Sequence, residues 1–448
     1  MTSGAEIAVA LAGTGAVVSP AGSPDSVGGV GGVVPTCVAA PGTVAQAAGV
    51  LQAAAGLGMA VVARGSGRTI SWGLPPARCD VIADLSGMTQ ILEYAAGDLV
   101  VRAEAGVTLG QLAGVLAGKG QRLALDGPPG ATVGGVVARN AAGPLRLRYG
   151  LPRDLLIGIT IVRPDGHVAK AGGKVVKNVA GYDLGKLFAG SFGTLGLIAE
   201  VTFRLHPQPD ASAWVTGEFH DSAAAAEAAL AASASPLQPS AVELDRPRAG
   251  GPISVSTLLE GTSPGVSARA ERMRVALGHG ASEAMAAPRW WGSIGEAASG
   301  AVHGTLVRVA FWAAGLRPVL DAIDSVAADT GLAVAVGGSA GAGVLYASVA
   351  ADEDPGQVAM FVRAVRAATG SGPASGPGSG AGSGSGAGSG SAGGGPARGS
   401  VVVLTAPEAV RERVDLWGPV PSLSLMRAVK QQFDPGNLMA PGRGPGGI

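Results

Sequence analysis

The first half of the chain alternates short apolar runs with amphipathic stretches, a pattern that predicts mixed strands and helices. Helices are expected over residues 44–56, where Thr43 can supply the N-cap, and over residues 108–120, which Gly118 and Gly120 close. Strands are expected at the apolar and β-branched runs 33–38, 59–63, 81–86, 99–106 and 195–205. Because strands outnumber helices, the pattern favours an α+β fold over a strictly alternating parallel sheet.

After Pro207 the chain changes to Ala-rich stretches that separate further apolar runs. Helices are expected over residues 218–234, 266–278 and 316–331. Strands are expected at residues 253–261, 306–312 and 401–406, with a strand–turn–strand unit at 332–350. The second half therefore predicts a second α+β domain.

Two segments have compositions that argue against a packed structure. Residues 370–400 contain only Gly, Ser, Ala and Pro apart from Arg398, so too little apolar surface is present to offset the entropy of ordering. This tract is expected to be a disordered insertion, either tolerated at the surface, which we favour, or acting as an interaction tether. Residues 1–32 are small and Gly-rich without clear periodicity, which predicts a flexible N-terminal arm.

Charge and cysteine content exclude several classes of protein. Lys+Arg and Asp+Glu both number 32, so the net charge of +0 gives no electrostatic basis for binding nucleic acid or an anionic membrane. The uncharged windows 26–63 and 331–351 are interrupted by Gly or Pro, which argues against membrane-spanning helices. No Lys or Arg precedes the apolar residues of the N-terminus, which argues against a signal peptide and favours a cytoplasmic protein. Cys37 and Cys79 suit neither a disulfide framework nor a metal site and are expected to be buried packing residues.

Three glycine-rich segments are candidate binding loops: residues 64–69, 127–143 and 190–196. Successive small residues in the first allow backbone N–H groups to converge on a phosphate. The second places Gly134 and Gly135 in the first turn of a short helix, where free N–H groups would face an anion. The first segment, which follows the expected strand 59–63, contains no GxGxxG sequence that opens a helix. This argues against an NAD-binding Rossmann fold. One dinucleotide that touches all three segments explains them most economically.

In their order along the chain, these segments resemble the FAD-binding family of vanillyl-alcohol oxidase and para-cresol methylhydroxylase. The segments that carry the resemblance are ARGSGRT, DLSGM, VRAEAGVTL, TVGGVVARNAAG, RYGLPRDLLIGITIVRPDG, VVKNVAGYDLGKLFAGSFGTLG and FDPGNLMAPGR. Residues 174–184 and 414–443 are most similar to the FAD-binding E subunit of bacterial glycolate oxidase. The resemblance implies the α+β, two-subdomain flavin-binding fold of that family with a smaller α+β cap domain. The implied organisation is an FAD-binding domain at 33–208, a cap or substrate domain at 209–415, and a C-terminal segment, 416–448, that returns to the FAD-binding domain.

The resemblance also implies which residues hold FAD. Residues 64–69 would wrap the diphosphate, the 132–135 segment would meet the diphosphate and the ring edge, and the 193–198 segment would lie beside the flavin. Because Arg68 stands where some relatives carry a histidine that attaches FAD covalently, the cofactor is expected to be noncovalent. The implied cofactor-binding residues are Arg64, Gly65, Ser66, Gly67, Arg68, Thr69, Thr132, Gly134, Gly135, Gly193, Thr194 and Ile198.

The sequence departs from the family's catalytic pattern. Residues 337–346 stand where catalytic relatives carry histidines for a divalent metal, and they include none, so no metal is expected here. The five histidines have spacings that suit no metal cluster: His167, His206, His220, His279 and His303. Ala440 occupies a position where relatives often have Asn near the flavin ring. The sequence assigns no catalytic residue.

Two polar groups near the expected flavin site have open interpretations. One is an arginine group around Tyr149, which is either a clamp for a substrate carboxylate or, as we favour, a set of structural ion pairs: Arg139, Arg146, Arg148 and Arg153. The other either borders the flavin or is solvated: Lys174, Lys177, Tyr182 and Asp183.

The resemblance leads to one main functional hypothesis and two alternatives. The chain would be the FAD-binding subunit of a glycolate oxidase complex, in which glycolate is oxidised to glyoxylate and electrons pass through flavin to an iron–sulfur partner. Its two cysteines are too few for a four-cysteine cluster, so an iron–sulfur subunit and a second FAD subunit are the expected partners. Membrane association would arise only through those partners. The alternatives are a non-catalytic FAD scaffold or electron-relay subunit, and a stand-alone alditol or lactone oxidase.

Overall fold

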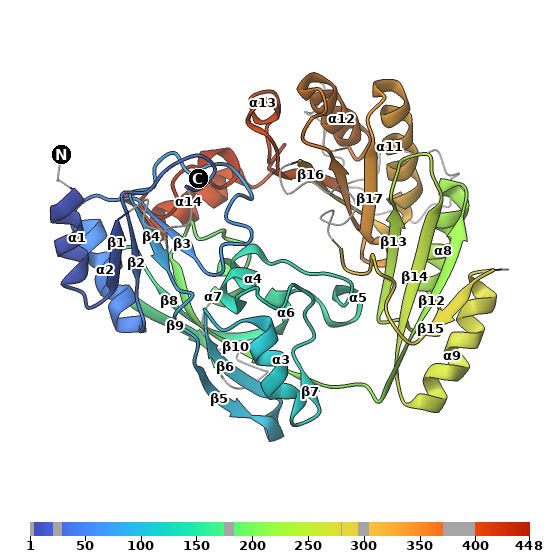
Figure 1. Cartoon of the computed structure of the whole chain (residues 1–448), viewed down its shortest axis with the longest axis horizontal. Helices are drawn as coiled ribbons and strands as arrows, with labels where there is room; N and C mark the ends of the chain where they lie inside the picture. The colour runs from blue at the N-terminus through green and yellow to red at the C-terminus, as the bar shows by residue number, and fades with distance from the viewer. Residues whose placement is uncertain (1–3, 21–28, 174–182, 279, 294–303, 371–398) are drawn as a thin grey trace, which may run out of the picture. The chain divides into compact units, whose positions relative to one another are not determined.

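The computed structural model describes residues 4–20, 29–173, 183–278, 280–293, 304–370 and 399–448. It divides into a first unit of Met1–Ala211 with Val420–Ile448 and a second unit of Ser212–Pro419 (Figure 1). These limits lie close to the expected boundaries at residues 208 and 415. Most of the expected insertion, residues 371–398, lies outside the described part of the chain.

The first unit begins with a four-stranded sheet in the order β1-β2-β4-β3. Its strands are β1 Val17–Pro20, β2 Cys37–Ala40, β3 Val61–Arg64 and β4 Val81–Asp84. The last three are parallel, and helix α2, Val44–Gly56, connects β2 to β3. The helix starts where expected, because the Thr43 side chain accepts a hydrogen bond from Gln46 N.

The expected flexible N-terminal arm is wrong for residues 4–20. Helix α1, Gly4–Ala12, leads into β1, which pairs antiparallel with β2. Leu11 is fully buried in the core that α2 also lines, and Ala16 is buried there too. Burial against α2 and pairing with a sheet edge stabilise a segment whose own sequence carries little helical periodicity.

The second sheet of this unit has five antiparallel strands in the order β5-β6-β10-β8-β9. Its strands are β5 Ile91–Ala95, β6 Val100–Glu104, β8 Leu156–Val162, β9 Val168–Gly172 and β10 Leu197–Arg204. A short pair joins β7, Gln121–Arg122, to β11, His206–Pro207. The helices of this part are α3 Leu109–Ala117, α4 Val133–Arg139, α5 Arg146–Tyr149, α6 Pro152–Leu155 and α7 Leu184–Phe188. Except for the short α5, these helices share an apolar core with the sheet, built mainly from Val, Ile, Leu and Phe side chains.

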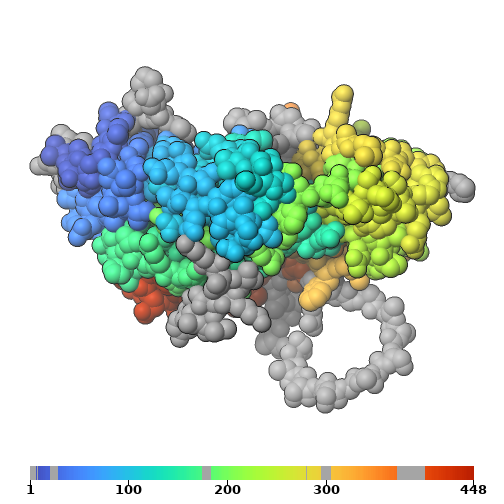
Figure 2. Space-filling model, turned by 90° about the horizontal axis from the view of Figure 1, so that it is seen from below, coloured from blue at the N-terminus to red at the C-terminus, as the bar shows by residue number. Residues whose placement is uncertain are grey.

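The C-terminal segment returns to the first unit. Helix α14, Leu423–Phe433, packs Phe433 edge-on against Phe188 with ring centroids 5.5 Å apart. Beyond the helix, Met439 forms a parallel bridge with Val61, and the Val61 N–H donates to Leu438 O at 2.7 Å. The tail therefore extends the first sheet beside β3, and Figure 2 shows this segment in red at the surface of the unit.

The second unit contains an eight-stranded sheet in the order β15-β12-β14-β13-β17-β18-β16-β19. Its strands are β12 Ala211–Phe219, β13 Ala241–Arg246, β14 Ile253–Gly261, β15 Ser282–Ala284, β16 Thr305–Phe311, β17 Val334–Ser339, β18 Val344–Val349 and β19 Gly399–Thr405. Its helices are α8 Ser222–Ser233, α9 Ser263–Ala276, α11 Leu316–Thr330, α12 Pro355–Ala368 and α13 Glu408–Arg411. The four long helices lie along one side of the sheet (Figure 1), which confirms the expected α+β character.

Two further expectations concern membrane-spanning helices and the cysteines. Within the described residues, no helix has both the length and the apolar character needed to cross a bilayer. Cys37 and Cys79 are both free and buried, as predicted, and burial raises the pKa of the Cys79 thiol to about 12. Both cysteines are packing residues of the first unit.

Candidate functional site

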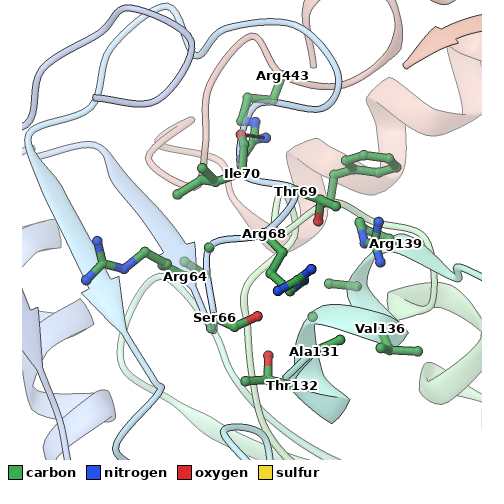
Figure 3. A pocket seen from close by; sticks show the side chains of 16 residues that line it. Arg64, Ser66, Arg68, Thr69, Ile70, Ala131, Thr132, Val136, Arg139 and Arg443 are labelled. Carbon is green, nitrogen blue, oxygen red and sulfur yellow. Dashed lines mark hydrogen bonds between the residues drawn. The ribbon is translucent and has the colours of Figure 1, made fainter. Parts of the chain in front are cut away.

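Two adjoining hollows open in the first unit where β3 ends. The larger encloses about 570 Å³, counting its open mouth, and is lined by residues from the β3–β4 connection, α4, the 190–196 turn and the C-terminal tail. Its lining includes Arg68, Arg139 and Arg443 (Figure 3). The smaller reaches Gly193, Gly196 and Ile198. Both hollows are lined by Ala63, Arg64, Gly65, Thr132, Gly135 and Ala138.

The loop after β3 presents a row of unused backbone donors to the larger hollow. Among the described residues, none of the five N–H groups from Gly65 to Thr69 donates to a protein acceptor. The loop is closed behind them by the Ile70 N–H, which donates to Gly67 O at 3.1 Å, and Gly67 has a φ of 73° that suits glycine. Successive free N–H groups in such a turn form an anion-binding concavity.

Two arginines of this loop have different roles. Arg64 is buried and forms an ion pair with Asp84, its register partner on β4. Figure 3 shows the Arg64 side chain directed away from the other labelled polar groups, whereas Arg68 extends toward Ala131 and Thr132. Arg68 is exposed and makes no ion pair within the described part of the chain. The Asp84 carboxylate thus holds one end of the Arg64 guanidinium, and a contact of Arg64 with the diphosphate stays a prediction.

The two glycines of helix α4, Gly134 and Gly135, have different surroundings. The Gly134 N–H donates to Ala105 O at 2.9 Å, and the Val133 N–H donates to Val107 O at 2.8 Å. The expectation of a free N–H group at this helix start is therefore wrong for Gly134. A Cβ on Gly134 would lie 2.6 Å from Ala105 Cβ, so Gly134 allows the helix to pack closely. Gly134 lines the smaller hollow only, whereas Gly135 lines both, and a Cβ on Gly135 would approach only Thr132 Oγ1, at 3.1 Å.

The 190–196 turn is held against α4 from the opposite side. The Gly190 N–H donates to Val137 O at 3.0 Å, and the Phe192 N–H donates to Ala138 O at 2.9 Å. Gly193 has a φ of 75°, and a Cβ there would touch Ala63 Cβ at 3.8 Å. Thr194 lines neither hollow, and its hydroxyl donates to Ser191 O at 2.7 Å.

The structure thus brings every predicted cofactor residue except Thr194 to the two hollows. Their contacts with a cofactor stay a prediction. Sequence reasoning missed Phe192 and Arg443, which also line the larger hollow. Arg443 ends the FDPGNLMAPGR motif, and that position was the available signal.

The arginine group expected around Tyr149 divides between two places. Arg139 lines the larger hollow and stacks over the Trp72 ring at 4.7 Å. At Tyr149, Arg148 lies over the ring at 5.6 Å, and Arg122 donates to the hydroxyl at 2.8 Å. Whether these arginines bind a substrate carboxylate or form structural ion pairs stays a prediction.

The remaining polar candidates are the histidines and the group that includes Asp183. Burial lowers the pKa of His206, and the positive charges of Arg204, Arg122 and Arg148 lower it further. No group of three metal-ligating side chains occurs among the described residues. Asp183 caps α7 by accepting from Lys186 N at 3.1 Å. The other members of its expected group, Lys174, Lys177 and Tyr182, lie outside the described residues, as do His279 and His303.

Comparison with known proteins identifies the cofactor. A family model described as an FAD binding domain matches residues 35–172. The chain is 36% identical over 188 residues to an uncharacterized FAD-linked oxidoreductase of Mycobacterium tuberculosis, covering 42% of this chain and 41% of that protein. It is 32% identical over 221 residues to glycolate oxidase subunit GlcD of Bacillus subtilis, covering 48% and 46%. It is 40% identical over 125 residues to glycolate oxidase subunit GlcE of Escherichia coli, covering 27% and 36%. The chain spans less than half the length of these relatives.

Solved structures extend the likeness to nearly the whole chain. A carbohydrate oxidase from Microdochium nivale superposes with a TM-score of 0.68 at 17% identity, covering 97% of this chain and 98% of the other. Para-cresol methylhydroxylase superposes with a TM-score of 0.66 at 18% identity, covering 92% and 89%. The free N–H row and the open backbone at Gly135 fit FAD, which presents an anionic diphosphate and a flat ring. The chain therefore contains an FAD binding domain at residues 35–172, and as a whole it has the fold of solved flavoproteins such as para-cresol methylhydroxylase.

Proposed function

We propose that this chain is an FAD-dependent oxidoreductase that acts on the CH–OH group of 2-hydroxy acids, glycolate in particular. The observation that carries the proposal is the row of free N–H groups from Gly65 to Thr69 at the mouth of the larger hollow. The similarity to two glycolate oxidase subunits supports the substrate class. FAD, when bound, supplies the two-electron acceptor for such a reaction.

The residues around the hollows have distinct proposed tasks. The Gly65–Thr69 N–H groups and the Arg68 guanidinium hold the diphosphate. Thr132 and Gly135 meet the diphosphate and the ring edge, while Gly193 and Ile198 lie beside the flavin. Gly134 and Thr194 act indirectly, because each is bonded within the protein frame that supports these contacts. Arg64 supports the loop through Asp84.

The proposed working form is a complex. The chain's two cysteines are buried and too few for a four-cysteine cluster, so an iron–sulfur subunit would receive the electrons. A second FAD subunit would carry the metal site for substrate oxidation. One observation favours a second candidate, an FAD scaffold or electron relay without turnover of its own. Residues 337–346, from the end of β17 to the start of β18, contain no histidine.

The first prediction concerns reduction of the flavin by substrate. Anaerobic addition of glycolate should bleach the visible flavin absorption, and D-lactate serves as a second 2-hydroxy acid. Bleaching of the purified chain alone would identify it as the catalyst, whereas bleaching only with its partner subunits would favour the relay. Absence of bleaching in both preparations, with an alditol reducing the flavin instead, would contradict the proposed substrate class.

A second prediction concerns the attachment of FAD. Arg68 offers no nucleophilic side chain for a covalent bond to the flavin, and its guanidinium instead faces the hollow. Acid precipitation of the holoprotein should therefore release all the yellow colour into the supernatant. Colour retained in the washed pellet would contradict noncovalent binding.

A further inference from the structure

Arg443 joins the C-terminal tail to a turn far away in the sequence. Its side chain is buried, with 4% of the residue's surface exposed. Its Nη2 donates to Ile70 O at 2.6 Å and to Trp72 O at 2.8 Å. The tail is itself fixed beside β3, where the Ala440 N–H donates to Val61 O at 2.8 Å. The guanidinium is thus the link between an anchored tail and the 70–72 turn.

The charge of Arg443 has no counter-ion in the part of the chain that the structure describes. Among the described residues, no carboxylate lies within salt-bridge distance of its guanidinium, and its Nε has no hydrogen-bond acceptor. By contrast, the buried Arg64 and Arg246 each pair with an aspartate. Burial lowers the pKa of Arg443 to about 10, as expected for a buried guanidinium without a neighbouring carboxylate. A buried cation without a partner is unfavourable, so this site favours an anion.

The turn that Arg443 holds forms part of the rim of the larger hollow. Ile70 lines the hollow, and the Trp72 ring covers the Arg139 guanidinium at 4.7 Å. Arg443, Arg68 and Arg139 all line the same hollow, and Figure 3 shows Arg443 reaching toward Ile70 from the tail. The tail, the turn and Arg139 are therefore connected through Arg443 and Trp72.

We propose that Arg443 is a positioning residue whose buried charge is compensated by the diphosphate of FAD, so that cofactor binding and docking of the C-terminal tail on the 70–72 turn stabilise each other. This inference rests on the proposed FAD site and adds a coupling that the fold alone does not require. It follows that the flavin-free protein contains an uncompensated buried charge. Removing that charge should weaken FAD binding without weakening the flavin-free fold.

The test compares Arg443→Gln with wild type and with Arg443→Lys, using full-length protein stripped of flavin. Arg443→Gln should bind FAD about 10- to 100-fold more weakly, as expected for loss of a charge-assisted contact. Its flavin-free thermal midpoint should equal or exceed that of wild type. Arg443→Lys keeps the charge and should lose less affinity. Unchanged FAD affinity in Arg443→Gln would overturn the coupling. So would a lowered flavin-free thermal midpoint, if the loss of FAD affinity were no larger than that loss of stability explains.

A matched control is available in the second unit. Arg366 is also buried, and its guanidinium donates to Val401 O and Leu416 O, both at 3.3 Å. Arg366→Gln should lower the thermal midpoint of the flavin-free protein and leave the affinity of the intact protein for FAD unchanged. This is the pattern of a purely structural arginine.

A second measurement on the wild-type chain keeps the inference testable even if Arg443→Gln does not fold. FAD, and ADP as a diphosphate without a flavin ring, should each slow trypsin cleavage after Arg427, an exposed residue of α14, whereas riboflavin should not. Equal cleavage rates with and without FAD would refute the coupling. Failure of the wild-type chain to bind FAD at all would instead refute the proposed function.

Discussion

A Gly135→Val variant is expected to lose FAD binding and keep its fold, whereas Gly134→Val is expected to lose stability. The two glycines are neighbours on α4, yet they face different surroundings. A side chain on Gly135 enters both hollows and meets only Thr132 Oγ1 at 3.1 Å. A side chain on Gly134 meets Ala105 Cβ at 2.6 Å and Ala105 O at 3.0 Å, where the helix packs on the protein core.

The expected magnitudes differ accordingly. Gly135→Val should weaken FAD binding by at least about 100-fold, since a loss of about 3 kcal/mol follows when a side chain occupies cofactor space. Its flavin-free stability should change little, because Val has a helix propensity no worse than that of Gly. Gly134→Val should lower the free energy of unfolding by about 1–3 kcal/mol or more through overpacking. Flavin fluorescence titration and urea unfolding measure the two effects.

Gly135→Ala is the graded control. Its smaller side chain should reduce FAD affinity less than valine does, with unfolding again close to wild type. Full flavin retention by Gly135→Val would show that this helix turn does not approach the cofactor. Equal destabilisation by both valine variants would show that neither glycine has a role separate from packing.

How far the sequence predicts this molecule depends on the range of the contacts involved. The apolar run at residues 253–261 becomes β14 with the same limits, and Thr43 caps α2 as expected, because burial pattern and capping are local properties. The glycine segments were also correctly grouped, since a flexible backbone next to strand ends is visible in the residue types. Local sequence patterns therefore predict most of the helices and strands and most of the residues that line the hollows.

The rest depended on contacts between distant residues. Arg64 and Asp84 are register partners on parallel strands, so their ion pair follows only from the pairing of β3 with β4. Ordering of residues 4–20 follows from packing on α2 and from pairing with β2. Arg443 reaches Ile70 across 373 positions in the sequence, and no local pattern encodes that contact.

The last prediction concerns the ion pair that fixes the tail. It joins Lys430, in α14, to Asp434, the C-cap of that helix. Lys430 Nζ donates to Asp434 Oδ2 at 2.6 Å, to Thr194 O at 2.7 Å and to Met439 O at 2.9 Å. Asp434 also accepts from the backbone N–H groups of Leu438 and Met439, at 2.9 and 2.7 Å. Both side chains are buried. One amine therefore holds together the helix, the tail and the 190–196 turn.

Lys430→Met is expected to lower the free energy of unfolding by about 3–5 kcal/mol, because it leaves a buried carboxylate and two carbonyl groups without their donor. Burial already lowers the pKa of Lys430, against the raising effect of Asp434, so the pair depends on mutual compensation. A double-mutant cycle with Asp434→Asn should give a coupling of at least about 1 kcal/mol. Urea unfolding of the two single variants and the double variant measures it.

The matched control is Lys186→Met, which breaks the exposed pair with Asp183 at 3.3 Å. An exposed pair contributes about 0–1 kcal/mol, so this variant should unfold nearly as wild type does. If Lys430→Met were no more destabilised than Lys186→Met, the tail would be held by its backbone bridge to β3 alone. A large loss confined to Lys430→Met would instead show that this buried amine keeps the tail in place, as the proposed coupling between Arg443 and FAD requires.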